Sequence, residues 1–157
     1  MIKKLLLFLV LISIAGCSVP SKGLNIYFYD KEGKLISVTR ELPTIENPVT
    51  VAIDQLLKGP TEQDAAKGIV TRIPAGTRAR NVEVEGEVAI INFNSALSNI
   101  KGGNKEVNEV LAQIISTATS VKGIKQVILK LQGSDQFTLG SEEYLIDHPL
   151  EKSDIKI

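Results

Sequence analysis

The most constraining feature of this sequence is a long helical repeat of apolar residues in its second half. Between positions 104 and 121 these residues recur at intervals of three and four, at Val107, Val110, Leu111, Ile114, Ile115, Ala118 and Val121. In an α-helix this spacing places them on one face. We predict that Asn104 caps the helix and that Lys122-Gly123 ends it. A helix with so long an apolar face needs another layer of structure to cover it.

A β-hairpin and a shorter helix are predicted before this helix. Leu24 to Tyr29 alternates between an apolar and a more polar face, and Lys34 to Arg40 supplies a second, more polar strand. Turn-forming residues 30–33 lie between them, so we expect the two strands to pair. Asn47-Pro48 then predicts the N-cap and the first residue of a helix. Gly59-Pro60 ends that helix, because Gly accepts a left-handed conformation and Pro cannot continue the hydrogen bonding.

The remaining segments are predicted to be mostly β-structure. Strands are expected over residues 78–85, 88–93 and 125–131, with a short edge strand within 137–150. Val82 and Val84 are expected to face inward, and the strand 88–93 is apolar on both faces, which is typical of a central strand. Residues 61–73 are polar and predict irregular structure with one short helical turn.

The order of these elements, β-β-α-β-β-α-β, indicates the fold class. Because two amphipathic helices can cover only one face of a sheet, we predict an α+β fold, a two-layer sandwich with both helices on the same face. Residues 24–157 are long enough to bury a core without covalent crosslinks, and we expect them to form a single domain.

The first 16 residues have the pattern of a secretory signal peptide. Lys3 and Lys4 precede an apolar run that is too short to span a bilayer and that ends in small residues. Cys17 follows directly, so we predict that its thiol carries a lipid and that residues 17–23 tether the domain to the outer face of the cytoplasmic membrane. The alternative is an ordinary secreted protein in which Cys17 has no lipid.

Composition excludes several classes of function. Lys+Arg and Asp+Glu both number 18, which leaves no broad positive field for nucleic acid. The single Cys and the single His cannot supply a disulfide framework or a metal centre made of several thiolates or imidazoles. We therefore expect neither a metal nor a cofactor, and no nucleic-acid partner.

Few residues are candidates for catalysis. His148 lies near the C-terminus, and no Gly-x-Ser-x-Gly nucleophile elbow occurs in the sequence for it to serve. The carboxylate pairs Glu83/Glu85 and Glu142/Glu143 could belong to a hydrolase that uses two carboxyl groups. Glu83 and Glu85 alternate with valines, however, as on the solvated face of a strand. We expect no catalytic residue and no enzyme.

Three other groups are candidates for binding. Gly102-Gly103 precedes a helix and could hold an anion, although a flexible connector is the simpler interpretation. Arginines flank the turn at Pro74 and could meet anionic lipids or an acidic partner, or discourage pairing at a strand edge; they are Arg72, Arg78 and Arg80. Tyr27 and Tyr29 either mark a binding surface or are simply good strand formers.

Several motifs together resemble the GerMN domain of sporulation and spore germination. They are Val49 to Pro60, Ile73 to Thr77, Val88 to Phe93, Gln113 to Thr117, Val127 to Gly133 and Leu145 to Leu150. The resemblance extends over Leu24 to Leu150. It implies a lipid-anchored module outside the cytoplasmic membrane of a Gram-positive bacterium, with a fold similar to the ring-building modules of secretion systems. It implies no catalytic residues. The family's best-known member has tandem domains and helps to assemble a membrane complex, whereas this chain has room for one domain.

Two functional hypotheses follow. The first is a non-enzymatic, lipid-anchored protein-interaction module that supports assembly of a sporulation, germination or envelope complex, with membrane proteins or other copies of itself as partners. The second is a lipoprotein that binds a cell-wall fragment or a small solute, which predicts an apolar pocket with a few convergent polar groups.

Overall fold

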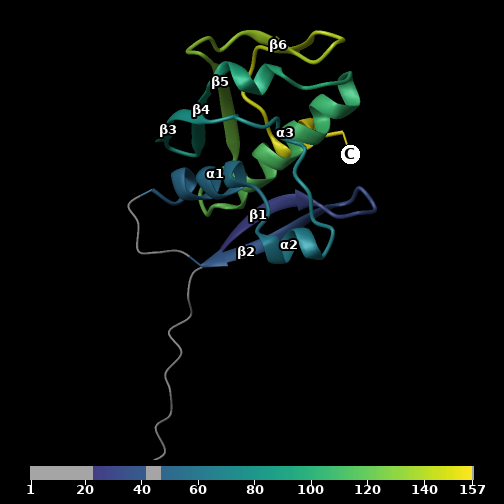
Figure 1. Cartoon of the computed structure of the whole chain (residues 1–157). Helices are drawn as coiled ribbons and strands as arrows, with labels where there is room; N and C mark the ends of the chain where they lie inside the picture. Colours follow the sequence, from purple (N-terminus) through teal and green to yellow (C-terminus); the bar gives the residue numbers. More distant parts are fainter. Residues whose placement is uncertain (1–22, 42–46, 157) are drawn as a thin grey trace, which may run out of the picture.

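The computed structural model describes residues 23–41 and 47–156 (Figure 1). The predicted signal peptide, the lipid on Cys17 and residues 18–22 of the predicted tether lie outside the described residues. In chain order the elements are β1 (Gly23–Tyr29), β2 (Leu35–Glu41), α1 (Pro48–Lys58), α2 (Glu62–Ala66), β3 (Ala79–Glu85), β4 (Val88–Phe93), α3 (Asn104–Ser120), β5 (Gln126–Leu131), β6 (Phe137–Leu139) and β7 (Tyr144–Ile146), with short 3-10 helices at Ser95–Ser98 and Lys152–Asp154.

The predicted α+β class is confirmed, but the described strands form three separate sheets. Strands β1 and β2 make an antiparallel hairpin, β3-β4-β5 makes a three-stranded sheet and β6-β7 makes a second hairpin. Within the three-stranded sheet β4 pairs antiparallel with β3 and parallel with β5. The central position of β4 is as predicted.

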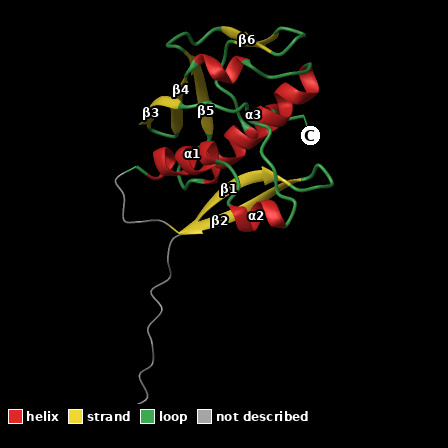
Figure 2. Cartoon of the chain, in the orientation of Figure 1, coloured by secondary structure: helices red, strands yellow, loops and turns green. Residues whose placement is uncertain are grey.

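Helices α1 and α3 lie between the β1–β2 hairpin and the three-stranded sheet (Figure 2). Both helices contact β1, while α1 also contacts β3 and α3 also contacts β5. Every residue of α3 from Val110 to Ala118 is buried. A helix on the surface of a two-layer sandwich would keep one face in solvent. The prediction of one sheet with both helices on one face is therefore wrong in this respect: the hairpin adds a third layer.

Helix α1 begins and ends where the sequence predicts. The Asn47 side chain accepts hydrogen bonds from the backbone N–H groups of Val49 (3.1 Å) and Thr50 (3.3 Å), with Pro48 as the first helical residue. Gly59 follows the last turn with φ +81°, a conformation that costs Gly little. The buried face of α1 consists of Val49, Ala52, Ile53 and Leu56.

The ends of α3 differ from the prediction by one to three residues. Gly103, not Asn104, is the N-cap, and its N–H donates to the Glu106 carboxylate at 3.0 Å. The helix ends at Ser120, because Val121 takes an extended conformation that keeps its side chain in the core. Lys122-Gly123 therefore lies beyond the helix.

Helix α2 is the short helical turn expected within residues 61–73. Thr61 and Asp64 form a capping box in which each side chain bonds the backbone N–H of the other. Asp64 also pairs with Arg40 of β2, which joins this helix to the hairpin. Burial alone would raise the pKa of Asp64, but hydrogen bonds from Thr61 and Arg40 outweigh burial and lower the pKa to about 2.

The later strands differ from the sequence-based expectations in two details, although Val82 and Val84 share the inner face of β3 as predicted. Val82 is half-buried as predicted, but Val84 is 41% exposed, because β3 pairs with β4 on one side only and no described element covers its other side. The tail forms two short strands, which pair with each other as the β6–β7 hairpin, where one short edge strand was expected. The outer edge of β5 is met by Leu150, which exchanges two backbone hydrogen bonds with Val127 (2.8 and 2.9 Å).

Candidate functional site

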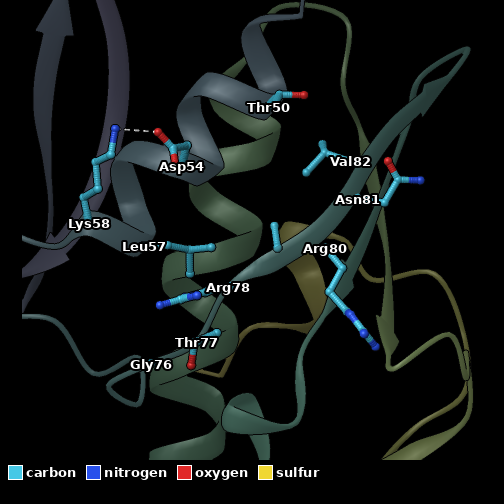
Figure 3. Close-up of a pocket in the computed structure, with 11 residues that line it drawn as sticks. Thr50, Asp54, Leu57, Lys58, Gly76, Thr77, Arg78, Arg80, Asn81 and Val82 are labelled. Carbon is cyan, nitrogen blue, oxygen red and sulfur yellow. Dashed lines mark ion pairs between the residues drawn. The ribbon is translucent and has the colours of Figure 1, made fainter.

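A groove of about 650 Å³ separates helix α1 from the edge strand β3 (Figure 3). Its walls are Thr50, Asp54, Leu57 and Lys58 from α1 and Gly76, Thr77, Arg78, Ala79, Arg80, Asn81 and Val82 from the turn and β3. Leu57, Ala79 and Val82 are partly buried and pack against the core. The groove therefore has an apolar floor with charged side chains around it.

The groove carries an excess of positive charge. Lys58 and Asp54 form an ion pair one helical turn apart, with 2.7 Å between Nζ and Oδ2. Arg78 and Arg80 form no ion pair with any residue in the described part of the chain. The two arginines are thus free to meet an anionic group.

The backbone at Arg78 is held rigidly. Its N–H donates to the Asn94 side chain and its carbonyl accepts from the Asn94 N–H, both at 3.0 Å. The same Asn94 side chain donates to the Gly76 carbonyl at 3.0 Å. The predicted turn is present, since the Thr77 N–H donates to the Pro74 carbonyl at 3.2 Å. These hydrogen bonds fix the backbone of Arg78 whether or not a ligand is bound.

Strand β3 has a distinct inner and outer face. Ala79, Val82 and Val84 lie opposite β4 residues that are completely buried, so their side chains belong to the inner face. Asn81, Glu83 and Glu85 belong to the outer face and are exposed, as the sequence predicts for the glutamates. Arg80 is an extra residue in a bulge between Ala79 and Asn81.

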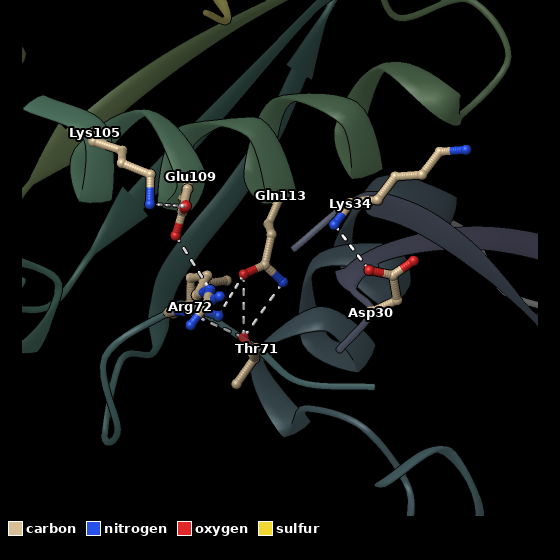
Figure 4. A network of polar contacts seen from close by, with 8 residues as sticks. Asp30, Lys34, Thr71, Arg72, Lys105, Glu109 and Gln113 are labelled. Atoms are coloured by element: carbon tan, nitrogen blue, oxygen red, sulfur yellow. Dashed lines mark hydrogen bonds and ion pairs between the residues drawn. The ribbon is translucent and has the colours of Figure 1, made fainter. Parts of the chain in front are cut away.

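Arg72 lies apart from the groove, in a polar network between α3 and the loop before β3 (Figure 4). Its Nε lies 3.1 Å from the Glu109 carboxylate, which also pairs with Lys105 at 3.2 Å. The Arg72 guanidinium lies 5.6 Å from the centre of the Tyr29 ring. The three arginines noted in the sequence therefore do not form one cluster.

Tyr29 is part of this interior and not of a binding surface. It is 1% exposed, and its hydroxyl has no hydrogen-bond partner among the described residues. Burial and the negative charge of Glu109 raise the pKa of Tyr29 to about 12, although the Arg72 charge acts in the opposite direction. Tyr27 is half-buried beside it.

Side chains of α3 close the free edge of β1. The Thr117 hydroxyl accepts from the Tyr27 N–H at 3.0 Å, and the Gln113 amide donates to the Tyr27 carbonyl at 3.0 Å. Ser120 donates to the Asn25 carbonyl at 2.9 Å. Polar residues of the helix thus replace a neighbouring strand, and β1 has little capacity to accept another chain.

The glycines before α3 do not form an open anion site. The Glu142 carboxylate accepts from the Asn104 N–H at 3.4 Å, and Glu106 accepts from the Gly103 N–H. A Cβ added at Gly103 would collide with Glu142. Because carboxylates of the chain itself occupy this helix N-terminus, Glu142 has a structural role and the anion-binding interpretation loses its support.

The other candidates lie at the surface. His148 Nδ1 is 2.9 Å from the carboxylate of its neighbour Asp147, and both side chains are about half exposed. Glu83 accepts from the Asn81 amide on the outer face of β3. Within residues 23–41 and 47–156, no group of three His, Cys, Asp or Glu side chains is placed to hold a metal ion. None of the described helices is long and apolar enough to cross a membrane.

A family model and a Bacillus subtilis protein that match this chain are described by sporulation or spore germination. The Germane family, described as sporulation and spore germination, matches residues 25–136. The spore germination protein GerM of Bacillus subtilis (strain 168) is 26% identical over 113 residues, which are 71% of this chain and 30% of GerM. The first GerMN domain of the B. subtilis sporulation protein GerM has a TM-score of 0.70 and 23% identity, over 84% of this chain and 98% of that domain.

Two further structures share the fold. The tandem GerMN domains of GerM match with a TM-score of 0.67 and 20% identity, over 84% of this chain and 46% of theirs. A putative lipoprotein from Clostridium perfringens matches with a TM-score of 0.56 and 17% identity, over 91% of this chain and 95% of its own. The chain thus spans 30% of the length of GerM and 46% of the tandem-domain structure. The B. subtilis match indicates a Gram-positive origin.

Proposed function

The chain belongs to the Germane family of sporulation and spore germination, and from that premise we propose that it is a non-enzymatic protein-interaction module. It works on the outer side of the cytoplasmic membrane and supports assembly of a sporulation, germination or envelope complex. Its partners are membrane or envelope proteins, including other copies of the chain.

The observation that carries the proposal is the groove between α1 and β3. It joins an apolar floor, two arginines without ion-pair partners in the described chain, and a strand edge with no described neighbour. These are features of a protein-docking surface, in which apolar contacts supply affinity and charges select the partner. The groove lies between secondary-structure elements, which hold its walls in place before a partner arrives.

Membrane attachment through Cys17 belongs to the same proposal. A diacylglyceryl group on its thiol would bring two acyl chains, enough for stable anchoring. The residues between Cys17 and β1 span at most about 20 Å when fully extended, since each adds no more than about 3.6 Å. The domain would therefore work close to the membrane surface, where a membrane-bound partner is within reach.

Crosslinking in cells tests this function. The tagged full-length chain is crosslinked, purified and analysed by mass spectrometry, beside Cys17→Ala and the groove variant Arg78→Glu/Arg80→Glu. We expect a discrete membrane partner with the wild type and a weaker yield with each variant. As a matched control, Lys101→Glu/Lys122→Glu changes two exposed cations outside the groove and should leave the yield unchanged. A wild type that crosslinks to no specific protein would contradict the proposal.

A further inference from the structure

The charges along β3 are arranged so that the strand complements itself. From Arg78 to Glu85 the sequence reads Arg-Ala-Arg-Asn-Val-Glu-Val-Glu, with two cations at the start and two anions at the end. None of these four charged side chains forms an ion pair with another residue of the described chain. Turned through 180°, the strand presents its acidic end to its own basic end.

We propose that β3 pairs antiparallel with β3 of a second copy of the chain, about a two-fold axis through Val82. The two three-stranded sheets would then become one continuous sheet of six strands. This inference rests on the proposed interaction function and names one partner and one surface for it. The occupant is a second copy because it is the partner whose charges are known to match those of the strand.

The bulge at Arg80 sets the register of this pair. With Arg80 counted as the extra residue, Val82 faces the partner's Val82 and Ala79 faces the partner's Val84, which are all inner-face residues. On the outer face, Asn81 meets the partner's Glu83, and at the end of the paired segment Arg78 lies opposite the partner's Glu85. Apolar residues therefore face apolar residues and polar residues face polar residues across the axis, which a strand with unrelated charges and bulge position would not achieve.

Each contact in this register provides a partner for a side chain or a strand edge of β3 that has none within the described chain. The exposed Val84 would pack beside the partner's Ala79, in the groove under the partner's Leu57. Arg78 and Arg80 would gain the partner's Glu85 and Glu83, with the symmetric pair on the other side. Cross-strand pairs of opposite charge and of apolar side chains both stabilise a sheet. The unpaired edge of β3 would also gain a neighbouring strand.

Other binding partners would match fewer of the charged side chains on β3. An acidic segment of a different protein would form ion pairs with Arg78 and Arg80 but would be repelled by Glu83 and Glu85. An anionic membrane surface would meet the same repulsion. Pairing through one strand buries less surface than the roughly 1,600 Å² of a standard stable interface, so the association is weak between molecules in dilute solution. Two copies anchored to one membrane would pair more readily, because anchoring raises their effective concentration.

Disulfide crosslinking of the full-length chain in bacterial membranes tests the pairing. Val82→Cys places one thiol on the proposed axis, and mild oxidation should give a covalent dimer on a non-reducing gel. Leu145→Cys, at a more exposed position on β7, is the control and should give little dimer. At about 1 M salt the screening length falls to about 3 Å, which weakens the attraction between the charged side chains of the two strands. The dimer yield should therefore fall.

Charge reversal makes the test specific. In the Val82→Cys background, Arg78→Glu/Arg80→Glu makes the strand wholly acidic, and Glu83→Arg/Glu85→Arg makes it wholly basic. Each variant alone should lower the dimer yield about tenfold or more, because four attractive contacts become repulsive. Co-expression of the two variants, or all four substitutions in one chain, should restore the dimer. The substituted side chains are exposed, and circular dichroism of each purified variant checks that it folds.

Two outcomes would overturn the inference. One is a dimer yield no higher for Val82→Cys than for Leu145→Cys, and the other is a yield that reversed charges do not lower or that recombination does not restore. The proposed function has a separate readout, the membrane partner captured in cells. If Glu83→Arg/Glu85→Arg still captures that partner while the covalent dimer is lost, the self-pairing is specific and a different surface binds the partner. If capture persists while the dimer never forms, the inference fails and the proposed function stands.

Discussion

Gln113 joins three parts of the chain from inside helix α3. Its side chain is completely buried, donates to the Tyr27 carbonyl on β1 and accepts from the Arg72 N–H at 2.6 Å. Its amide also lies 3.4 Å from the Thr71 hydroxyl. A buried polar side chain stabilises a fold only when its hydrogen bonds are made, and here one amide satisfies backbone groups of two separate segments.

We predict that Gln113→Leu lowers the free energy of unfolding by about 3 kcal/mol, because it removes the side-chain partner of the Tyr27 carbonyl and of the Arg72 N–H. Urea denaturation followed by circular dichroism measures the change. Gln63→Leu is the matched control, since Gln63 is exposed on α2, and it should change stability by less than about 0.5 kcal/mol. Equal effects of the two substitutions would contradict this account of Gln113.

Asp64 makes the stability of the fold depend on pH in the acid range. Its pKa falls from 3.8 to about 2 on folding, so its contribution is present above pH 4 and is lost as the pH falls towards 2. We predict that Asp64→Asn costs about 2 kcal/mol at pH 7 and that wild type and variant converge near pH 2. Denaturation curves across this range provide the measurement. Asp54→Asn, which removes an exposed ion pair, should cost less than about 1 kcal/mol.

Tyr29 makes the stability of the fold depend on pH in the alkaline range, where stability falls as the pH rises. Its pKa rises from 10.0 to about 12 on folding, so its contribution is present below pH 10 and is lost as the pH rises through 12. Tyr29→Phe removes an unpartnered buried hydroxyl, so at pH 7 stability should stay equal or rise by about 1 kcal/mol. Between pH 10 and 12 the variant should lose less stability than the wild type. A loss above 1 kcal/mol at pH 7 would indicate a hydrogen bond that the structure does not contain.

At the scale of elements, the β6–β7 hairpin closes the N-terminal end of α3. The Ser141 N–H and hydroxyl both donate to the Gly102 carbonyl, at 2.7 and 3.0 Å. Glu142 adds its carboxylate at the helix N-terminus. Glu142 thus satisfies one of the backbone N–H groups that a helix N-terminus leaves open, and Ser141 ties the loop before the helix to the hairpin. The close approach of the hairpin to α3 depends on Gly140, which has φ +71°.

We predict that Gly140→Ala destabilises the protein by about 2 kcal/mol or more. A Cβ there would lie 2.7 Å from the Val107 side chain and 2.9 Å from the Gly102 carbonyl, in addition to the strain of the positive φ. Gly33→Ala separates the two causes, because Gly33 has φ +79° and no atom near its added Cβ. Thermal unfolding of both variants should show the larger loss for Gly140→Ala. A similar loss of stability in both variants would mean that the hairpin shifts to make room for the methyl group at position 140 without a cost in stability.

At the scale of the whole molecule, the groove and the open edge of β3 lie beside each other on the three-stranded sheet. Strand β1 is bounded by α3 on one side and β2 on the other, and the β5 edge meets Leu150. Strand β3 keeps an edge without a described neighbour, beside the groove. The outer edge of β2 also has no described strand beside it, but the edge of β3 is the one that borders the groove, which is why our proposal places association there.

The proposed lipid on Cys17 would decide where the molecule lies in the cell. We predict that radiolabelled palmitate enters the wild type but not Cys17→Ala, and that the variant leaves the membrane fraction. Both follow if the thiol carries the acyl chains that hold the protein to the bilayer. Labelling of both proteins to the same extent would exclude lipidation at this residue.

Much of the fold follows from local rules that the sequence states directly. Asn47-Pro48 and Gly59-Pro60 bound α1 because capping and helix termination need only neighbouring residues. The alternation in residues 24–29 and the apolar run 88–93 identify a half-buried and a central strand for the same reason. The cations of the groove, Arg78 and Arg80, are visible in the sequence as well.

Only the tertiary structure decided how these elements are layered. Gln113 and Thr117 look like the solvent face of an amphipathic helix, yet they are buried because that face closes the edge of β1. Val84 alternates like a core residue, yet it is exposed because β3 is an edge strand. Periodicity reports which residues share a face, whereas the neighbour that covers the face comes from contacts distant in sequence. The sequence by itself therefore determined the elements and their order, and long-range packing determined which surfaces remain open for a partner.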